Sequence, residues 1–416
     1  MKQFEVVASW LSDCPTIGVC DITSARGKEV ISFSYSPEWL RTHPDVRIDP
    51  DLYPVSGRQY PPEDKSCFGF LSDSAPDRWG RKLMDRRERM EAAVENRPVR
   101  RLAESDYILG VHDEGRMGAL QFRNPESGMF IAAGDKTSIP PMHRLRELEQ
   151  ASLELEKDND PTGTKWLRDL IEPGSSLGGA RPKANVKGED GSLWIAKFPS
   201  VNDEVNTGAW ELVLHTLSKM VGIQVPEAGC MRLSETGDTF FIKRFDRDGI
   251  KRIQMASAMT LLGATDRATE SYDYIDMAGL LEQSGAEAEK DLRELWSRAV
   301  FHICTGNADN HLRNHAFLLA GNGWCLSPSF DVNPAYDRDD MELSIGGVHK
   351  RDIRAALDAA AYFRLNRNDA TERAKEIQQV IRNNWKKIAK QHGIPEHKIT
   401  LMREAFSQSE NTFIIT

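Results

Sequence analysis

The sequence lacks any apolar run that approaches the about 18 residues needed to span a membrane. It also lacks a basic N-terminal segment followed by an apolar stretch, so Met1 to Glu5 does not fit a secretory signal peptide. An excess of positive charge is missing too, because 54 Lys and Arg stand against 63 Asp and Glu, a net charge of −9. We therefore expect a cytoplasmic protein without a membrane partner, whose contacts with nucleic acid are local or made through another protein.

Cysteine is scarce, and its spacing excludes a disulfide framework. The six cysteines are scattered without a Cys-x-x-Cys pair, so we expect reduced and mostly buried thiols. His311 and His315 are four residues apart, as two ligands on one helical face would be. No glutamate occupies the HExxH position and no third ligand is evident, so we expect structural or active-site histidines rather than zinc ligands.

Three segments with different patterns follow one another along the 416 residues. Residues 1–125 begin with short alternating β-type runs, continue with a charge-rich helical stretch over 76–106 and return to a strand and turn pattern at 107–122. This predicts a first domain with a small antiparallel sheet.

Residues 126–254 are expected to form a second domain. An amphipathic stretch over 142–155 precedes a Gly/Ser-rich loop at 174–183 and a predicted β-hairpin that carries Lys197. A helix with apolar positions from Trp210 to Val221 follows, with Glu211 near its start, and then a strand over 239–246. From residue 255 to 416 the pattern is mainly helical, including an apolar stripe from Ile377 to Ile388.

The densest polar cluster lies at residues 305–314. Asp309 is followed five positions later by Asn314, then by a predicted hairpin over 316–326 and by a second carboxylate, Asp331. A protein kinase uses this layout, with the first carboxylate accepting the proton of the attacking hydroxyl while the amide and the second carboxylate hold Mg²⁺. Asp, Asn and Gly also gather wherever a chain turns, so this pattern alone does not decide.

The order of the parts strengthens the kinase hypothesis. A Gly/Ser loop, a strand lysine 14 residues beyond Lys183, a helix with Glu211 and the Asp-Asn-hairpin-Asp set follow one another as in kinases. In that layout Lys197 contacts the ATP phosphates and is oriented by Glu211, while the loop from Ser176 to Lys183 covers the phosphates. Taken singly, Lys197 reads as a solvated strand lysine and Glu211 as a helix first-turn acid. The loop is neither GxGxxG nor a Walker motif.

Six segments carry a resemblance to a known family: residues 68–80, 106–111, 174–183, 244–247, 306–314 and 326–331. Together they resemble the HipA-type serine/threonine kinases, the toxins of bacterial toxin–antitoxin pairs. The resemblance implies an α+β, atypical two-lobed protein-kinase-like fold with an N-terminal β-rich subdomain. The chain departs from the common kinase pattern in having no His-Arg-Asp before the base, as in the family itself, and Val332-Asn333 in place of Phe-Gly.

The resemblance implies the following roles, with ATP and Mg²⁺ as cofactors. Asp309 would be the catalytic base, Asn314 and Asp331 the metal ligands and Lys197 a phosphate contact. Ser176, or the adjacent Ser175, would be autophosphorylated, and the added negative charge would silence the enzyme. The expected nucleotide-binding residues are Ser176, Gly178, Gly179, Ala180, Lys183, Lys197, Glu211, Lys243, Phe245 and His311.

The same resemblance implies partners: a helix-turn-helix, HipB-like antitoxin, operator DNA reached through that antitoxin, and a translation-related protein substrate such as an aminoacyl-tRNA synthetase. Residues 78–101 carry a local excess of five positive charges, which fits a solvated helix with ion pairs or, alternatively, a DNA contact. Two other functions stay open: a small-molecule kinase of the aminoglycoside and choline kinase type, and a degenerate kinase that only binds antitoxin and operator.

Overall fold

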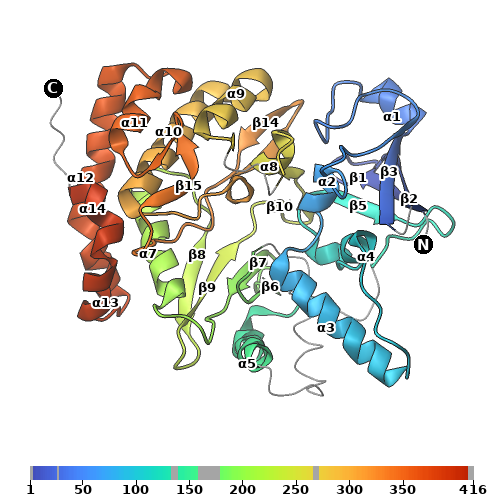
Figure 1. The fold of residues 1–416 in the computed structure, drawn as a ribbon, viewed down its shortest axis with the longest axis horizontal. Coiled ribbons are helices and arrows are strands. Elements are labelled where there is room, and N and C mark those ends of the chain that lie inside the picture. The colour runs from blue at the N-terminus through green and yellow to red at the C-terminus, as the bar shows by residue number, and fades with distance from the viewer. Residues whose placement is uncertain (1–2, 26–27, 133–138, 158–178, 266–270, 411–416) are drawn as a thin grey trace. The chain divides into compact units, whose positions relative to one another are not determined.

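The computed structural model describes residues 3–25, 28–132, 139–157, 179–265 and 271–410. It divides into two compact units, Met1–Asn202 with Arg232–Ala256, and Asp203–Met231 with Ser257–Thr416, called here the first and second units (Figure 1). Among the described residues, no helix combines the length and the apolar character needed to cross a membrane. All six cysteines are free, three of them buried and three half-buried.

The N-terminal part of the first unit is an antiparallel sheet, as predicted. Its strands are ordered β4-β3-β2-β1-β5, and each neighbouring pair is antiparallel. The alternating apolar residues of the long strands face one side of the sheet. The bounds are β1 Gln3–Ala8, β2 Thr16–Ala25, β3 Lys28–Tyr35, β4 Arg58–Gln59 and β5 Leu120–Arg123.

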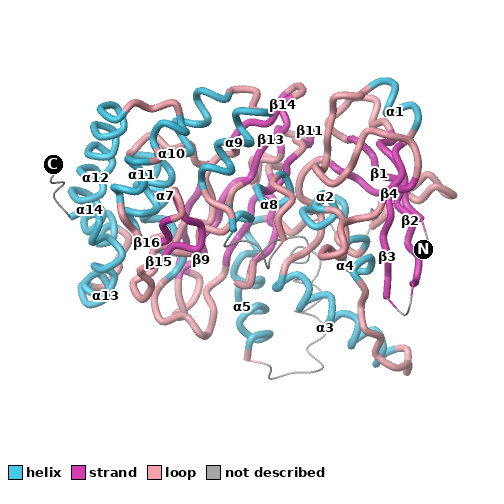
Figure 2. Tube along the Cα trace, turned by 45° about the horizontal axis from the view of Figure 1, so that its top comes forward, coloured by secondary structure: helices cyan, strands magenta, loops and turns pink. Residues whose placement is uncertain are grey.

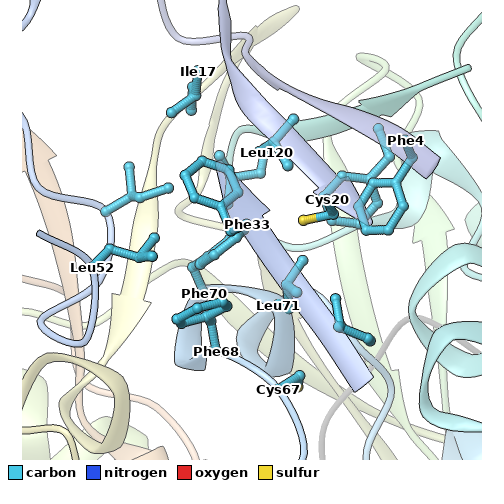
Figure 3. Packing of buried hydrophobic residues seen from close by; sticks show 14 of the residues in the cluster. Phe4, Ile17, Cys20, Phe33, Leu52, Cys67, Phe68, Phe70, Leu71 and Leu120 are labelled. Atoms are coloured by element: carbon cyan, nitrogen blue, oxygen red, sulfur yellow. The ribbon is translucent and has the colours of Figure 1, made fainter. Parts of the chain in front are cut away.

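One face of this sheet is covered by the helices α1 (Pro37–Thr42) and α2 (Gly69–Asp73) and by their loops. Phe33 lies at the centre, with ring contacts to Tyr35, Phe68 and Phe70 at centroid distances between 4.9 and 6.5 Å (Figure 3). Such edge-to-face packing and full burial stabilise the module by the hydrophobic effect.

Two further helices, α3 (Arg78–Val94) and α4 (Glu104–Leu109), follow in the first unit. The prediction of strand and turn from Tyr107 was wrong for the first three residues, which lie in α4. The reason is a local cap, because the Asp106 carboxylate accepts a hydrogen bond from the Ala103 N–H at 2.8 Å and stabilises the first turn.

A second sheet in the first unit contains β6 (Lys183–Lys187), β7 (Leu193–Lys197) and β9 (Asp238–Lys243), paired antiparallel in that order. The predicted hairpin with Lys197 is thus confirmed. Its apolar face packs on α3 and on α5 (Leu145–Glu156), and Trp79, Leu148 and Trp194 lie in this core. β8 (Ala228–Arg232) is the fourth strand of this sheet, next to β9. The short strands β10 (Arg247–Asp248) and β11 (Lys251–Arg252) pair with each other, and β12 (Met255–Ser257) follows.

The second unit is mainly helical, as predicted, and holds two hairpins (Figure 2). Its longest described helix, α12 (Arg367–Gln391), buries the predicted stripe except for the half-buried Val380, and the rings of Trp385, Trp210 and Phe406 contact one another. The helices are α7 Thr207–Met220, α8 Ala258–Leu261, α9 Tyr274–Ser284, α10 Ala288–Thr305, α11 Ile353–Asp358, α12 Arg367–Gln391, α13 Glu396–Leu401 and α14 Ser407–Glu410. The hairpins are β13 Ala316–Ala320 with β14 Gly323–Leu326, and β15 Asp340–Ile345 with β16 Val348–Lys350.

Candidate active site

The loop that carries Asp309 begins where α10 ends. Gly306 closes the helix at φ +65°, and a Cβ there would lie 2.8 Å from the Ala405 backbone, so only glycine fits. The Asp309 side chain is 66% exposed. Its backbone carbonyl accepts a hydrogen bond from Asn314 Nδ2 at 2.8 Å, and His311 Nε2 lies 3.9 Å from Asp309 Oδ1. Asp309, His311 and Asn314, which the sequence predicts as site residues, therefore share one compact loop.

Two buried asparagines, Asn307 and Asn310, stabilise the loop that carries Asp309. Asn310 accepts a hydrogen bond from the Leu343 N–H at 3.0 Å and donates to the Leu343 carbonyl at 3.3 Å. The Ala308 carbonyl accepts from the Glu342 N–H at 2.9 Å, so the loop is fastened to β15 by three bonds. The roles of Asn307 and Asn310 could not be predicted from the sequence, because an Asn-rich run is also typical of an ordinary turn.

The second carboxylate, Asp331, lies in a loop that is joined to the Asp309 loop by two hydrogen bonds. Asn307 Oδ1 accepts from the Asn333 N–H at 3.2 Å, and the Gly306 carbonyl accepts from the Ala335 N–H at 2.8 Å. Asp331 adopts φ +55°, a strained conformation for a residue with a side chain, and such strain is concentrated at functional sites. The structure thus brings the loops of Asp309, Asn314 and Asp331 together within the second unit.

The oxygen atoms of these loops fit a hard divalent cation. Asn314 uses its Nδ2 for the bond to Asp309, which leaves its Oδ1 to accept, and Asp331 contributes a carboxylate. Asn333 donates to Asp331 Oδ1 at 3.4 Å, while its own Oδ1 is buried and lacks a hydrogen-bond partner. Carboxylate and amide oxygens are ligands that hard cations such as Mg²⁺ accept. The described residues hold no group of three His, Cys, Asp or Glu suited to a metal.

Two buried histidines, His302 and His315, lie against the ring of Tyr274. The Tyr274 hydroxyl is 2.7 Å from His302 Nδ1 and accepts from Asn310 Nδ2 at 3.3 Å. Burial lowers the pKa of His302 to about 3, and burial also lowers the pKa of His315, so both rings are neutral near pH 7. His315 lies 5.4 Å from the Tyr274 ring, centroid to centroid, so of the two roles expected for it, structural or active-site, its full burial favours the structural one.

In the first unit, two lysines face each other on paired strands. Lys183 of β6 is directly opposite Lys197 of β7, so both ammonium groups project from the same face of the hairpin. Lys183 is 6% exposed, and Lys197 Nζ lies 5.8 Å from the centroid of the Phe240 ring. Two cationic groups on one face of a hairpin provide a positively charged surface of the kind that binds phosphate groups.

The Gly/Ser loop is described only from Gly179 onwards. Ser175, Ser176 and Gly178 lie outside the described residues, whereas Gly179 adopts φ +86° and Ala180 is exposed. A Cβ on Gly179 would lie 2.4 Å from Lys183 Nζ, so the chain passes close to that ammonium group.

The segment from Lys243 to Arg247 alternates between two environments. Arg244 and Asp246 are buried and joined by two hydrogen bonds at 2.6 and 2.9 Å, and Asp246 also accepts from Arg247 at 2.7 Å and from the Gly118 N–H at 2.8 Å. Burial opposes ionisation of Asp246, but the two guanidinium groups outweigh it and lower its pKa to about 2. This part of the motif therefore stabilises the first unit.

Lys243 and Phe245, the expected nucleotide contacts, are both half-buried. Lys243 Nζ lies 5.7 Å from the centroid of the Trp194 ring and 3.7 Å from Asp190 Oδ2. The backbone N–H between them, that of Arg244, donates to the Leu193 carbonyl at 2.9 Å and is committed to the sheet. Binding of the nucleotide by Lys243 and Phe245 stays a prediction.

Glu211 lies in α7, as predicted, but in the second turn. The helix begins at Thr207 after the Asn206 cap, so the interpretation of Glu211 as a first-turn acid was wrong. Glu211 is buried, with only 4% of the residue exposed. Its burial excludes the interpretation of Glu211 as a solvated carboxylate.

Comparison with known proteins settles the family. Residues 175–385, half of the chain, match the model of the HipA-like C-terminal domain, and residues 15–123 match that of the HipA N-terminal domain. The chain belongs to the HipA-like kinase family. The resemblance inferred from the six sequence segments is thereby confirmed. The relatives also support the assignment of this HipA-like chain to the kinases.

Individual relatives of the HipA-like chain are distant. It is 26% identical to "Putative kinase Y4mE" of Sinorhizobium fredii over 360 residues, 79% of this chain and 78% of the relative. It is 22% identical to the serine/threonine-protein kinase toxin HipA of Shewanella oneidensis over 278 residues, 58% of this chain and 62% of that one.

A solved structure of Shewanella oneidensis MR-1 HipA, in complex with HipB and its operator DNA, resembles the whole chain. The TM-score is 0.63 at 14% identity, with 98% of this chain and 95% of that chain covered. The predicted α+β kinase-like fold with an N-terminal β-rich part is confirmed.

Proposed function

We propose that this protein is an ATP- and Mg²⁺-dependent serine/threonine-protein kinase, the toxin of a toxin–antitoxin pair. The observation that carries the proposal is the direct bonding between the Asp309 loop and the Asp331 loop, through Asn307 with Asn333 and Gly306 with Ala335. Two carboxylates and an amide held on adjoining, internally bonded loops provide the groups that phosphoryl transfer needs.

In the proposed reaction the exposed Asp309 accepts the proton of a serine or threonine hydroxyl. The hydroxyl oxygen forms a bond to the γ-phosphorus of ATP as the bond to the ADP oxygen breaks. Asp331 and Asn314 would hold Mg²⁺, which supplies charge neutralisation when bound. Lys183 and Lys197 would bind the phosphates, with Glu211 orienting Lys197, and Lys243, Phe245 and His311 would complete the nucleotide site.

The proposed partners come from the family. The Shewanella complex contains HipB and operator DNA, so we propose a helix-turn-helix, HipB-like antitoxin and, through it, operator DNA. A translation-related protein, such as an aminoacyl-tRNA synthetase, is the proposed target, and the cytoplasm is the proposed location. Within α3 and the loop after it, Arg81, Arg97 and Arg100 form ion pairs with acidic residues, which favours the solvated, ion-paired interpretation of residues 78–101.

Autophosphorylation is proposed for Ser176, with Ser175 as the neighbouring candidate, and both lie outside the described residues. A phosphate adds nearly two negative charges and would repel the ATP phosphates. We therefore expect Ser176→Asp to weaken ATP binding. Full ATP affinity in this variant would refute the silencing mechanism.

The proposal is tested with labelled ATP. The purified chain, Mg²⁺ and γ-labelled ATP are incubated with bacterial lysate proteins or with a mixture of aminoglycosides and choline. Label in a protein band, lost in Asp309→Asn and kept in the matched variant Asp358→Asn, is the expected result; Asp358 pairs with Arg367 on the exposed surface of the same unit. Label in a small molecule would support the small-molecule kinase, and no ATP consumption would support a module that only binds antitoxin and operator.

A further inference from the structure

One family segment has no role in the chemistry described above. Residues 77–80, Asp-Arg-Trp-Gly, lie at the start of α3, and Asp77 is the N-cap of that helix. One carboxylate oxygen of Asp77, Oδ1, accepts from the Arg78 N–H at 2.8 Å. The other, Oδ2, accepts from the Gly179 N–H at 2.8 Å, although the two residues are 102 positions apart. Asp77 therefore joins the start of α3 to the Gly/Ser loop.

Trp79 makes the same connection twice more. Its backbone N–H donates to the Gly179 carbonyl at 3.1 Å, and its indole Nε1 donates to the Lys183 carbonyl at 3.0 Å. The residue is 2% exposed, because its ring lies in the core shared by α3, α5 and β6. Both backbone polar groups of Gly179 are thus held by the start of α3, which lies beside β6 in Figure 1.

These contacts lie at the junction between the Gly/Ser loop and β6. Gly179 has φ +86°, and the chain returns within four residues to Lys183, the first residue of β6. Lys183 is the residue that lies opposite Lys197. Any movement of Gly179 or of the Lys183 backbone would therefore move one member of the lysine pair relative to the other.

We propose that Asp77 and Trp79 are positioning residues of the nucleotide site. They hold the end of the Gly/Ser loop and the first residue of β6 in the arrangement that binds phosphates, so that little ordering is needed when ATP arrives. Neither side chain contacts the nucleotide. The inference rests on the proposed ATP-dependent function and adds that the N-terminal part of the chain sets the affinity for ATP.

Two substitutions isolate these contacts. Asp77→Ser keeps an N-cap of similar quality but has no second oxygen to accept from Gly179. Trp79→Phe keeps an aromatic ring in the core and removes only the indole donor. Matched controls are Asp352→Ser, which changes the N-cap of α11 with its bond to the Arg354 N–H at 2.9 Å, and Trp39→Phe, at a buried tryptophan of the N-terminal sheet.

The first measurement is the split between KM and kcat. We expect the KM for ATP to rise about fivefold to tenfold in Asp77→Ser and in Trp79→Phe, as loss of one hydrogen bond to a preorganised site would cause, with kcat within twofold of the parent. Both controls are expected to keep the parental KM. A parental KM in both test variants, or a fall in kcat alone, would overturn the inference.

The second measurement needs no activity. Amide hydrogen exchange of Gly179 in the full chain reports its bond to Asp77 directly. Protection in the parent, lost in Asp77→Ser and kept in Asp352→Ser, is expected, and an unprotected Gly179 in the parent would overturn the inference. If the parent neither binds nor consumes ATP while Gly179 is protected, the proposed function fails and the positioning of Gly179 stands.

Discussion

Replacement of Asp246 by asparagine should destabilise the first unit strongly. The Asp246 carboxylate is 1% exposed and accepts from Arg244, Arg247 and the Gly118 N–H, all between 2.6 and 2.9 Å. Asp246→Asn keeps the shape but removes the negative charge, and it turns an N–H group towards a buried guanidinium. Removing one partner of a buried ion pair costs about 3–5 kcal/mol, because the remaining charge is left uncompensated.

For a unit of this size, such a loss corresponds to a fall in Tm of about 10 °C. Differential scanning calorimetry would measure it, with Asp358→Asn as control; that carboxylate is 73% exposed, and loss of its ion pair should cost less than about 1 kcal/mol. The pKa of Asp246 is lowered to about 2, so its contribution is present above about pH 4 and is lost as the pH falls towards 2. A Tm for Asp246→Asn within 2 °C of the parent would show that this buried ion-pair network contributes little to stability.

Three further predictions concern the second unit. Asp309→Asn should lower kcat by about 10²–10⁴ with unchanged ATP affinity, since a general base is lost, and equal kcat would remove Asp309 from that role. Asn310→Ala should leave both Leu343 backbone groups unsatisfied, at about 1–3 kcal/mol each, and should lower kcat together with the Tm; a parental kcat would show that the loop holds its shape without this clamp. Because burial lowers the pKa of His302 to about 3, protonation of this ring should contribute about 2 kcal/mol to the loss of stability between pH 7 and pH 5, and urea unfolding of His302→Gln should show a loss that is smaller by this amount.

Local patterns in the sequence predicted several elements correctly. The alternation around Lys197, with a Gly-Glu-Asp-Gly turn before it, predicted the β6–β7 hairpin, and the 3.6-residue spacing of apolar side chains predicted α7 and the buried stripe of α12. These signals depend on neighbours in the chain, so they can be read from the sequence.

Contacts between distant residues could not be read in this way. The bonds of Asp77 with Gly179 and of Asn310 with Leu343 join residues 102 and 33 positions apart, and no periodicity specifies such a pair. The β15–β16 hairpin was missed for a different reason. Met341, Leu343 and Ile345 alternate before a Gly-Gly turn, a usable signal that was hidden inside a region read as helical.

Positive φ at Asp331 was also beyond the sequence, because aspartate only tolerates the left-handed region without requiring it. The spacing of Asp309, Asn314 and Asp331 predicted a common site. The structure adds how Asn307 and Asn333 fasten the two loops to each other.

Calorimetric titration of ATP, with and without Mg²⁺, is the most direct test of the roles proposed for Asp331 in holding Mg²⁺ and for Lys197 in binding phosphates. We expect ATP to bind to the parent chain more tightly with Mg²⁺, Asp331→Ala to abolish this Mg²⁺ dependence, and Lys197→Ala to weaken binding in both conditions. No heat of binding in the parent chain at millimolar ATP, or an unchanged Mg²⁺ dependence in Asp331→Ala, would contradict it.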